Sequence, residues 1–443
     1  MKIQLSDRFT YRRLIRFTLP SMGMMVFSSI YGVVDGLFVS NFAGKIPFAA
    51  INLIMPFLMV TGFLGFMVGA GGTAIVARTL GEGKPERANE IFSFLIYFLI
   101  LSGLVITVVG LALMRPISIA LGADEELLPY CVSYGRIAMI STVPFMLQNT
   151  FQSLLVTAER PNLGFAVTVA AGVTNIVGDL VLVGILKWGV VGAAIATTAS
   201  EALAGVVPLI YFAMPNNSLL RLGRTRPDWK VLWETCVNGS SELMSSISMS
   251  VVSMVYNFQL MKFAGADGVA AYGVIMYIGF IFIAIFIGYS MGSAPIIAYN
   301  YGAENRAELR NLLNKSVKMI GILAVLMSAL AIVAAEPLAK IFVGYDADLM
   351  AMTVRAFRIY AVSYLLSGFN IFGSSLFTAL SNGLISAVIS FFRSLVFQNA
   401  AVLLLPVFFG LDGIWYAIQV AELLAFFLTC ALVWRYRERY GYL

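Results

Sequence analysis

The chain has no histidine, few cysteines and few charged residues. None of its 443 residues is histidine, so it lacks the commonest metal ligand and the side chain that titrates nearest neutrality. Its three cysteines have no CxxC spacing, which favours neither disulfides nor a thiolate metal site. Only 12% of the residues are charged. Any proton handling must therefore use carboxylates.

Apolar residues make up most of the chain, with 60% hydrophobic residues and a mean hydropathy of +0.89. Such a composition cannot place its apolar side chains inside and its polar ones in water, so the solvent must be lipid. Each crossing of a ~30 Å hydrocarbon core takes about 20 to 25 residues. The length therefore predicts an all-α integral membrane protein of twelve transmembrane helices, with no large soluble domain.

Apolar runs between charged or Gly/Pro clusters predict where these helices lie. The runs are near residues 15–41, 48–79, 90–114, 127–158, 162–186, 189–213, 235–264, 268–300, 316–336, 349–380, 384–408 and 411–434. About 20 of the 29 Lys and Arg residues lie at the termini and in the even-numbered loops. Because such residues mark the cytoplasmic side, we expect a multi-pass protein of the cell (inner) membrane with both termini cytoplasmic. The net charge of +6 then reflects the Lys and Arg residues of the cytoplasmic segments, and it does not indicate a nucleic-acid-binding surface.

The two halves of the chain match each other at an offset of 221 residues. GGTAIVARTLGEGKPER at 71–87 faces GSAPIIAYNYGAENRAE at 292–308, and Glu201 falls on Glu422. Repeats of this kind are typical of transporters, although Gly and Ala also recur by chance in membrane helices. The repeat predicts two pseudo-symmetric six-helix lobes around a central cavity, joined by a cytoplasmic linker. The predicted bounds are 1–214 for the first lobe, 215–230 for the linker and 231–443 for the second lobe.

Four oxygen-bearing side chains from three predicted spans lie at a similar depth in the outer half of the first lobe. They are Asp35, Asn175, Asp179 and Thr197. Asn175 precedes Asp179 by four residues and so shares its helical face. A carboxylate at membrane depth costs about 2.5 to 3.5 kcal/mol, so those present are usually functional or paired. Such oxygens suit a hard cation, and a close carboxylate pair can also carry a proton.

The repeat restricts this candidate site to the first lobe. Asp35, Asn175 and Asp179 fall on Tyr256, Val396 and Ala400 in the second half. None of these three can do the same work. A polar cluster that only holds helices together is the alternative, although amides and hydroxyls do that more commonly than two carboxylates without a basic partner. We expect coupling to Na⁺ or H⁺ in the first lobe, with no cofactor and no other metal.

Other polar residues in the predicted spans each have two interpretations. Glu201 and Glu422 suit either a structural hydrogen bond in each lobe or a cavity-facing acid that attracts cationic substrates. Gln148 and Gln152, one turn apart, could line the cavity or join helices by hydrogen bonds. Pro20 could bend the first helix or mark a helix end.

Several motifs together are specific for one family. VVDGLFVSNFAG ends the first span, GTAIVARTLGEGKPERAN follows the second, NIVGD lies in the fifth, GVVGAAIATT in the sixth and GSAPIIAYNYGAEN follows the eighth. The chain thereby resembles the multidrug and toxic compound extrusion (MATE) family, in its DinF- and MepA-like branch, over essentially its whole length. The resemblance implies twelve helices in two lobes with a V-shaped cleft, and exchange of Na⁺ or H⁺ inward for drug outward.

The resemblance also assigns residues. It matches Asp35, Asn175, Asp179 and Thr197 to the family's cation site, and Pro20 to the proline associated with bending of the first helix. Some members carry further acidic coupling residues in the second lobe. Because Tyr256, Val396 and Ala400 stand at the equivalent positions here, we do not transfer that second site.

The expected function is secondary active efflux of organic, often cationic, compounds by antiport through alternating access. The expected partners are small organic substrates and membrane lipid, without nucleic acid, and the protein is expected to act as a monomer. A flippase of lipid-linked precursors is the alternative, and it would need a cation-lined cavity for pyrophosphate. Four arginines lie well inside the predicted spans, away from the span ends, but they are scattered: Arg136, Arg355, Arg358 and Arg393. An enzyme is not expected, because the sequence contains no HExxH motif and no paired cytoplasmic DxxD motif.

Overall fold

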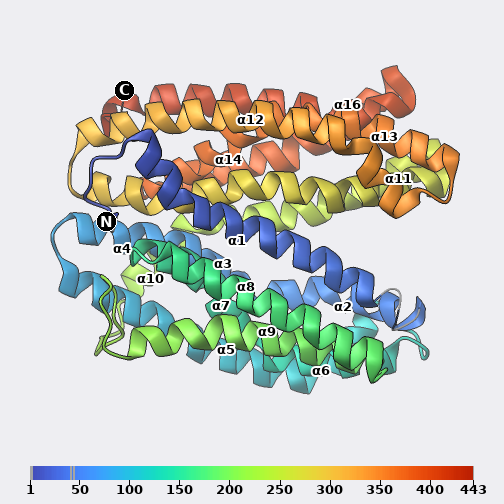
Figure 1. Ribbon diagram of the computed structural model, residues 1–443, viewed down its shortest axis with the longest axis horizontal. Helices are drawn as coiled ribbons and strands as arrows, with labels where there is room; N and C mark the ends of the chain where they lie inside the picture. The colour runs from blue at the N-terminus through green and yellow to red at the C-terminus, as the bar shows by residue number, and fades with distance from the viewer. Residues whose placement is uncertain (1–2, 40–41, 43–44, 443) are drawn as a thin grey trace. The chain divides into compact units, whose positions relative to one another are not determined.

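The computed structural model describes residues 3–39, 42 and 45–442, and these form helices and connecting turns without a strand (Figure 1). Helices satisfy every backbone N–H and C=O group within one segment, which a lipid environment requires. The predicted all-α membrane fold is therefore observed. Part of the first family motif, at residues 40–41 and 43–44, lies outside the described residues.

The chain divides into two compact units. Unit 1 comprises Met1–Leu5 and Phe27–Cys236, and unit 2 comprises Ser6–Val26 and Val237–Leu443. These bounds differ from the predicted lobes at the N-terminus, because residues 6–26 group with the second half of the chain. The first helix, α1, consequently contributes residues to both units.

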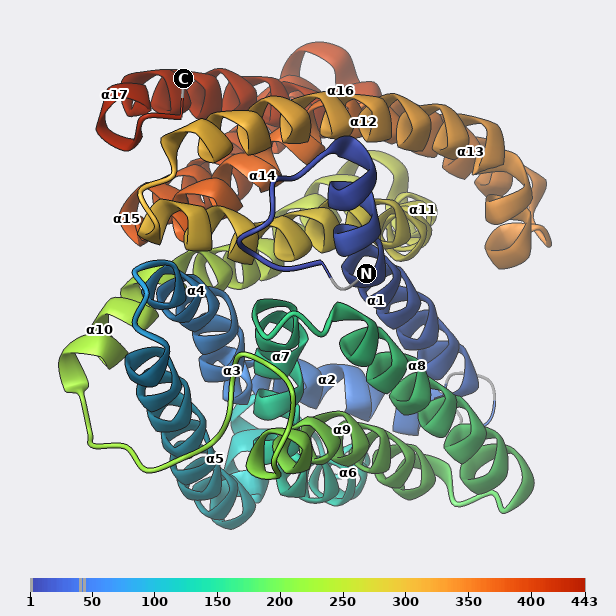
Figure 2. The ribbon, with the colours of Figure 1, turned by 60° about the vertical axis from the view of Figure 1, so that its left-hand side comes forward.

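Unit 1 holds the helices that carry the candidate site, and within it α9 packs beside α7 and α8 (Figure 2). Its elements are the C-terminal part of α1 (Tyr11–Phe38), α2 (Lys45–Thr61), α3 (Phe63–Met67), the π-helix η2 (Val68–Gly72), α4 (Thr73–Gly81), α5 (Pro85–Ala120), α6 (Leu128–Ile140), α7 (Thr142–Thr157), α8 (Pro161–Gly178), the π-helix η3 (Asp179–Ile185), α9 (Gly189–Ala213) and most of α10 (Trp229–Asn238).

Unit 2 has an apolar core rich in buried aromatic side chains, contributed mainly by α11, α12, α13, α14 and α16. Its elements after α10 are α11 (Ser240–Gly302), α12 (Arg306–Val343), α13 (Ala347–Ala361), α14 (Tyr364–Ala379), α15 (Gly383–Ser390), the π-helix η4 (Phe391–Phe397), α16 (Gln398–Arg435) and α17 (Arg437–Tyr440).

Eight helices among the described residues are long and apolar enough to cross a membrane, or nine if the bent pair α13 and α14 counts as one span. Two long helices also contain a break at a glycine in the left-handed region, Gly265 with φ 62° in α11 and Gly410 with φ 58° in α16. Glycine adopts this conformation without the penalty of a Cβ atom. With these breaks, each predicted span corresponds to a helix or a run of consecutive helices, which is consistent with twelve crossings.

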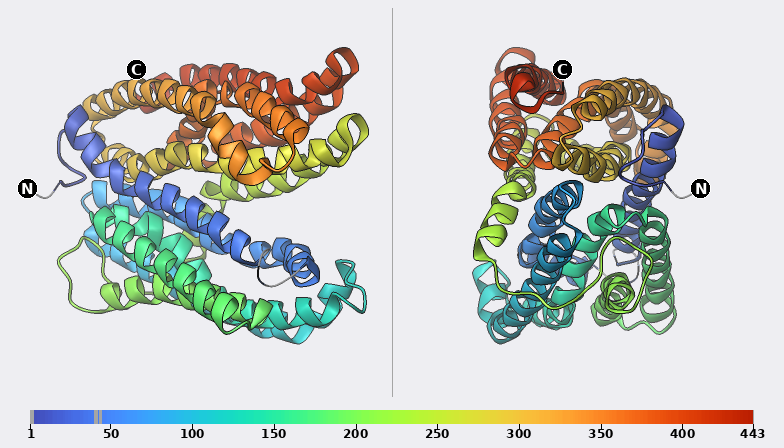
Figure 3. Two further views of the ribbon diagram at one scale, coloured as in Figure 1. Left: turned by 45° about the vertical axis from the view of Figure 1, so that its right-hand side comes forward. Right: turned by 90° about the vertical axis from the view of Figure 1, so that its left-hand side faces the viewer.

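Helix α1 is continuous through Pro20, and Figure 3 shows it in blue as one helix. Its N-terminal part packs backbone against backbone on α11, since a Cβ atom at Gly288 would lie 2.4 Å from Cα of Met22. Its C-terminal part packs on α8, where a Cβ atom at Gly172 would lie 2.4 Å from the ring of Phe27. Glycine at both positions lets helices approach closely, as is common in membrane bundles.

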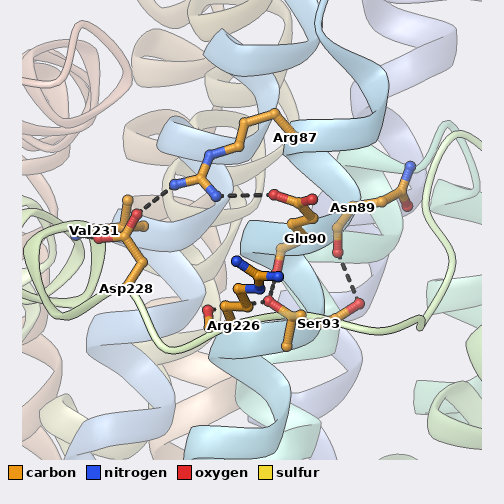
Figure 4. Close-up of polar contacts among 8 residues, drawn as sticks. Arg87, Asn89, Glu90, Ser93, Arg226, Asp228 and Val231 are labelled. Carbon is orange, nitrogen blue, oxygen red and sulfur yellow. Dashed lines mark hydrogen bonds and ion pairs between the residues drawn. The ribbon is translucent and has the colours of Figure 1, made fainter.

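The segment between α9 and α10 is held along α5, within unit 1, by an ion pair and hydrogen bonds. Arg87 lies between Glu90, at 2.9 Å, and Asp228 (Figure 4). The N–H of Gly223 donates to Oγ of Ser93 at 3.0 Å. The predicted linker thus has a defined path on one unit, and it ends where Asp228 accepts a hydrogen bond from the N–H of Val231 in the first turn of α10, at 3.1 Å.

Candidate functional site

The structure brings the four predicted site residues of the first lobe together. Asp35 comes from α1, Asn175 from α8, Asp179 from the first position of η3 and Thr197 from α9. The carboxyl groups of Asp35 and Asp179 are neighbours, and Asp35 also lies beside Asn175. The amide of Asn175 donates to the hydroxyl of Thr197 at 3.4 Å.

Local sequence explains why these elements meet. Gly178 allows α8 to approach α9, because a Cβ atom there would lie 2.8 Å from Cβ of Ala196, next to Thr197. Directly after Gly178 the helix widens into η3, which begins at Asp179. Such π-segments inside helices occur frequently at functional sites.

The cluster has more acceptor oxygens than donors. Asp179 is 0% exposed and Asn175 is 2% exposed. One oxygen of Asp35, both oxygens of Asp179 and the amide oxygen of Asn175 are buried without a hydrogen-bond partner among the described residues. Because an unpaired carboxylate in a low-dielectric site is costly, this oxygen set suits a cation or a proton that the carboxylates share.

A second polar layer lies one helical turn away. Glu201 follows Thr197 by four residues on α9, and Tyr31 precedes Asp35 by four residues on α1. The hydroxyl of Ser141 donates to the carboxylate of Glu201, and the amide of Gln148 lies 3.5 Å from the hydroxyl of Tyr31.

Tyr31, Tyr134 and Ser141 were not predicted as site residues. Tyr134 is buried beside Thr197 and lies within electrostatic reach of Asp35, Asp179 and Glu201. For Tyr31, the spacing of four residues from Asp35 was the available signal. Ser141 and Tyr134 come from a separate predicted span, so no sequence spacing pointed to them.

Gln148 and Gln152 line a small pocket between α7, α8 and α9 of unit 1. Ala204 and Pro208, which lie three and seven residues after Glu201, line the same pocket. The pocket and Glu201 therefore share one face of α9.

Glu422 in unit 2 is not a free carboxylate. It is 2% exposed and accepts hydrogen bonds from Arg393 at 2.7 Å and from the amide of Asn370 at 2.6 Å. Of its two interpretations, the contacts fit the structural one, because Arg393 already supplies a charge partner. Both acids accept a hydrogen bond from a neighbouring helix segment, but only Glu422 also has a basic partner.

The other arginines of the predicted spans are mostly paired as well. Arg355 lies 2.7 Å from Asp412, and Arg358 lies 3.8 Å from Glu336. With Arg393 bound to Glu422, three of the four arginines have an acidic partner, which leaves little free positive charge for a pyrophosphate group.

Comparison with known proteins identifies the family. The MatE family model matches residues 20–181 and 243–401, which is most of the chain and includes both halves of the repeat. The chain belongs to the MATE family. The resemblance predicted from the motifs is thereby confirmed, and the protein is a multi-pass membrane protein.

Relatives of this MATE protein cover almost its full length. The multidrug export protein MepA of Staphylococcus haemolyticus is 25% identical over 430 residues, covering 97% of this chain and 94% of the relative. MepA of Staphylococcus aureus is 24% identical over 435 residues, with the same coverage of 97% and 94%.

Solved structures agree with the fold. A crystal structure of MATE in complex with MaL6 matches with a TM-score of 0.92 and 22% identity, covering 98% of this chain and 97% of that chain. An outward-facing multidrug resistance MATE transporter of the MOP superfamily matches with a TM-score of 0.91 and 22% identity, covering 97% and 98%. These likenesses establish the MATE fold.

Proposed function

We propose that this MATE protein is a secondary active exporter of organic, often cationic, compounds, driven by antiport with Na⁺ or H⁺. The observation that carries the proposal is the group of buried, unpartnered oxygens on Asp35, Asn175 and Asp179. The names of the MepA relatives support multidrug compounds as the exported class.

The proposed cycle uses the cluster as the cation site of an alternating-access carrier. A cation from outside binds Asp35, Asn175, Asp179 and Thr197, or protonates the carboxylate pair, and stabilises the conformation that has released drug. A ligand can shift such an equilibrium only by its differential affinity for the two states. An inward elementary charge adds about 2.3 kcal/mol per 100 mV for a neutral substrate. No cofactor takes part, and the substrates are small organic molecules.

Ethidium transport in proteoliposomes, under an opposing Na⁺ or H⁺ gradient, tests this function. Wild-type protein is expected to accumulate ethidium with one of the two gradients, and Asp35→Asn is expected to abolish that response. Asp412→Asn is the matched control, because Asp412 pairs with Arg355 at an exposed position of unit 2. It should transport at the wild-type rate.

Two outcomes would contradict the proposal. Gradient-driven transport that persists in Asp35→Asn would show that coupling does not need this carboxylate. Absence of ethidium transport by the wild type under both gradients would favour a flippase or another substrate class. A flippase is the weaker candidate, since Arg355, Arg358 and Arg393 are paired with acids.

A further inference from the structure

Glu201 and Glu422 occupy equivalent positions in the repeat but have different surroundings. Glu422 is bonded to Arg393 and Asn370. Glu201 has the hydroxyl of Ser141, a neutral donor, as its hydrogen-bond partner. No basic side chain of the described residues pairs with Glu201 or contributes to its electrostatic surroundings. Two acids at related positions are therefore stabilised by different means.

The difference has a steric origin. The position equivalent to Arg393 in the first half is Gly172. A Cβ atom at Gly172 would lie 2.4 Å from the ring of Phe27 and 2.8 Å from that of Tyr31. These two rings on α1 thus fill the space that an arginine side chain at position 172 would need, so this position cannot supply Glu201 with the counter-charge that Arg393 provides in the second half.

Further polar groups gather around Glu201. Gln148 is 9% exposed, its amide nitrogen lies 3.5 Å from the hydroxyl of Tyr31, and its amide oxygen is buried without a partner. Tyr31 itself lies within electrostatic reach of both Glu201 and Asp35. Gln148 is thus linked to the surroundings of Glu201 through the hydroxyl of Tyr31, and a cation would satisfy acceptor oxygens of this kind.

The charged and titratable groups facing Glu201 are all acidic or phenolic. They come from α1 (Tyr31 and Asp35) and from α6 (Tyr134). At the start of α7, the neutral hydroxyl of Ser141 bonds to Glu201, and further along this helix the neutral amide of Gln148 lies against Tyr31. An external cation is therefore required if Glu201 is to be charged at low cost.

We propose that Glu201, with Tyr31, Ser141 and Gln148, forms a second cation subsite, one helical turn along α9 from the Asp35–Asp179 cluster. The coupling cation, Na⁺ or a proton, moves from the first cluster to this subsite on its way through unit 1. Thr197 and Glu201, four residues apart, provide oxygens on the same face of α9 for the two positions. This inference rests on the proposed cation-driven export and adds a second binding position for the cation.

The test measures exchange and binding separately. Tetraphenylphosphonium exchange in proteoliposomes is recorded against Na⁺ and against H⁺ concentration, and equilibrium binding of tetraphenylphosphonium is measured on purified protein. Glu201→Gln is expected to lower the maximal exchange rate at least tenfold while the Kd for tetraphenylphosphonium changes less than twofold. The cation whose concentration dependence changes identifies the ion.

The control for the same chemical change is Glu126→Gln, at an exposed position of the loop before α6, which should exchange at the wild-type rate. Ser141→Ala keeps the carboxylate and removes its hydrogen bond, so it is expected to shift the half-saturating cation concentration at least twofold. It tests the subsite even if Glu201→Gln does not fold. An unshifted cation dependence in Ser141→Ala would count against the proposal.

Other results would overturn the second subsite in distinct ways. If Glu201→Gln exchanges tetraphenylphosphonium at the wild-type rate at every cation concentration, the cation does not pass by Glu201. Loss of tetraphenylphosphonium binding with normal transport of a neutral substrate would place Glu201 in the drug site instead. If the wild type shows no cation-driven exchange, the proposed function itself fails, and that failure is visible before any variant is compared.

Discussion

The two units accommodate buried polar groups in opposite ways at positions that the repeat makes equivalent. In unit 1, Asp35 and Asp179 lie together, with buried oxygens that have no hydrogen-bond partner within the described part of the chain. In unit 2, the equivalent of Asp35 is Tyr256, which stacks on Tyr272 with ring centroids 4.6 Å apart. The acid of unit 2, Glu422, is neutralised by Arg393.

The two units differ in how their buried carboxylates are stabilised: Glu422 of unit 2 has a basic partner, whereas Asp35 and Asp179 of unit 1 have none among the described residues. In unit 2 the buried acid already has a basic partner, and the unit's buried side-chain atoms without a hydrogen-bond partner among the described residues are hydroxyl and amide oxygens, such as those of Tyr256 and Asn370, with no carboxylate among them. Carboxylates without a basic partner are tolerated where a ligand or a proton completes them. The two repeat-related units therefore differ in their buried acids: those of unit 1 lie beside each other, as the proposed cation site requires, and that of unit 2 is paired with an arginine.

The largest expected effect is the loss of the ion pair in unit 2. Arg393→Met leaves Glu422 buried without a counter-charge, and breaking such a pair typically costs about 3 to 5 kcal/mol. We expect the free energy of unfolding in detergent micelles to fall by that amount, measured by denaturant titration. The double variant Arg393→Met with Glu422→Leu should recover most of it, since neutral replacement of both partners is often tolerated. A single variant as stable as the wild type would show that Glu422 has another partner.

The next largest effect is a steric loss of stability at Gly172. It tests why unit 1 has no arginine at the position equivalent to Arg393. Gly172→Ala places a methyl group 2.4 Å from the ring of Phe27, and overpacking of this kind costs about 1 to 3 kcal/mol. Gly184→Ala is the matched control, because its nearest neighbour would lie at 3.8 Å, an ordinary contact. Thermal unfolding should separate the two variants. Equal stability would mean that α1 can withdraw from α8 without cost.

At the Asp35–Asp179 cluster we expect a smaller change in the free energy of unfolding, and in the opposite direction. Asp179→Asn removes one of two adjacent carboxylates, so we expect the free energy of unfolding to stay level or rise by up to about 1 kcal/mol. Glu422→Gln removes a charge that Arg393 needs, and it should lower the same quantity. The comparison of the two units fails if both variants are destabilised to the same extent.

Much of this arrangement could be predicted from residue patterns, because lipid imposes strong constraints. Apolar runs predicted the spans, and the depth of Asp35, Asn175, Asp179 and Thr197 predicted that they meet. The pairing of Glu422 with Arg393 could not be predicted, since it depends on which faces of separate helices adjoin. The division of α1 between the units was also missed, because hydropathy does not reveal close packing of the kind seen at Gly288.

The smallest effect is expected at the ion pair of Arg87 and Asp228, which holds the linker on α5. This pair is more exposed than the buried ion pair of unit 2, so its loss should cost less. The pKa of Asp228 is held below its usual value by the N–H of Val231 first and then by Arg87. A carboxylate with a lowered folded-state pKa stabilises the protein above its unfolded pKa of about 3.9, and this contribution disappears as the pH falls through the folded value.

Asp228→Ala should therefore cost about 1 kcal/mol at pH 7, because it removes both the helix cap and the ion pair. Asp228→Asn keeps a capping oxygen and loses only the pair, so its cost should be about 0.2 to 1 kcal/mol. Unfolding of each variant and the wild type between pH 3 and 7 measures both costs. The difference between wild type and Asp228→Asn should begin to shrink as the pH falls below about 4 and should be smaller at pH 3 than at pH 7. If it is as large at pH 3 as at pH 7, the amide disturbs α10 directly, and charge is not what holds the linker on α5.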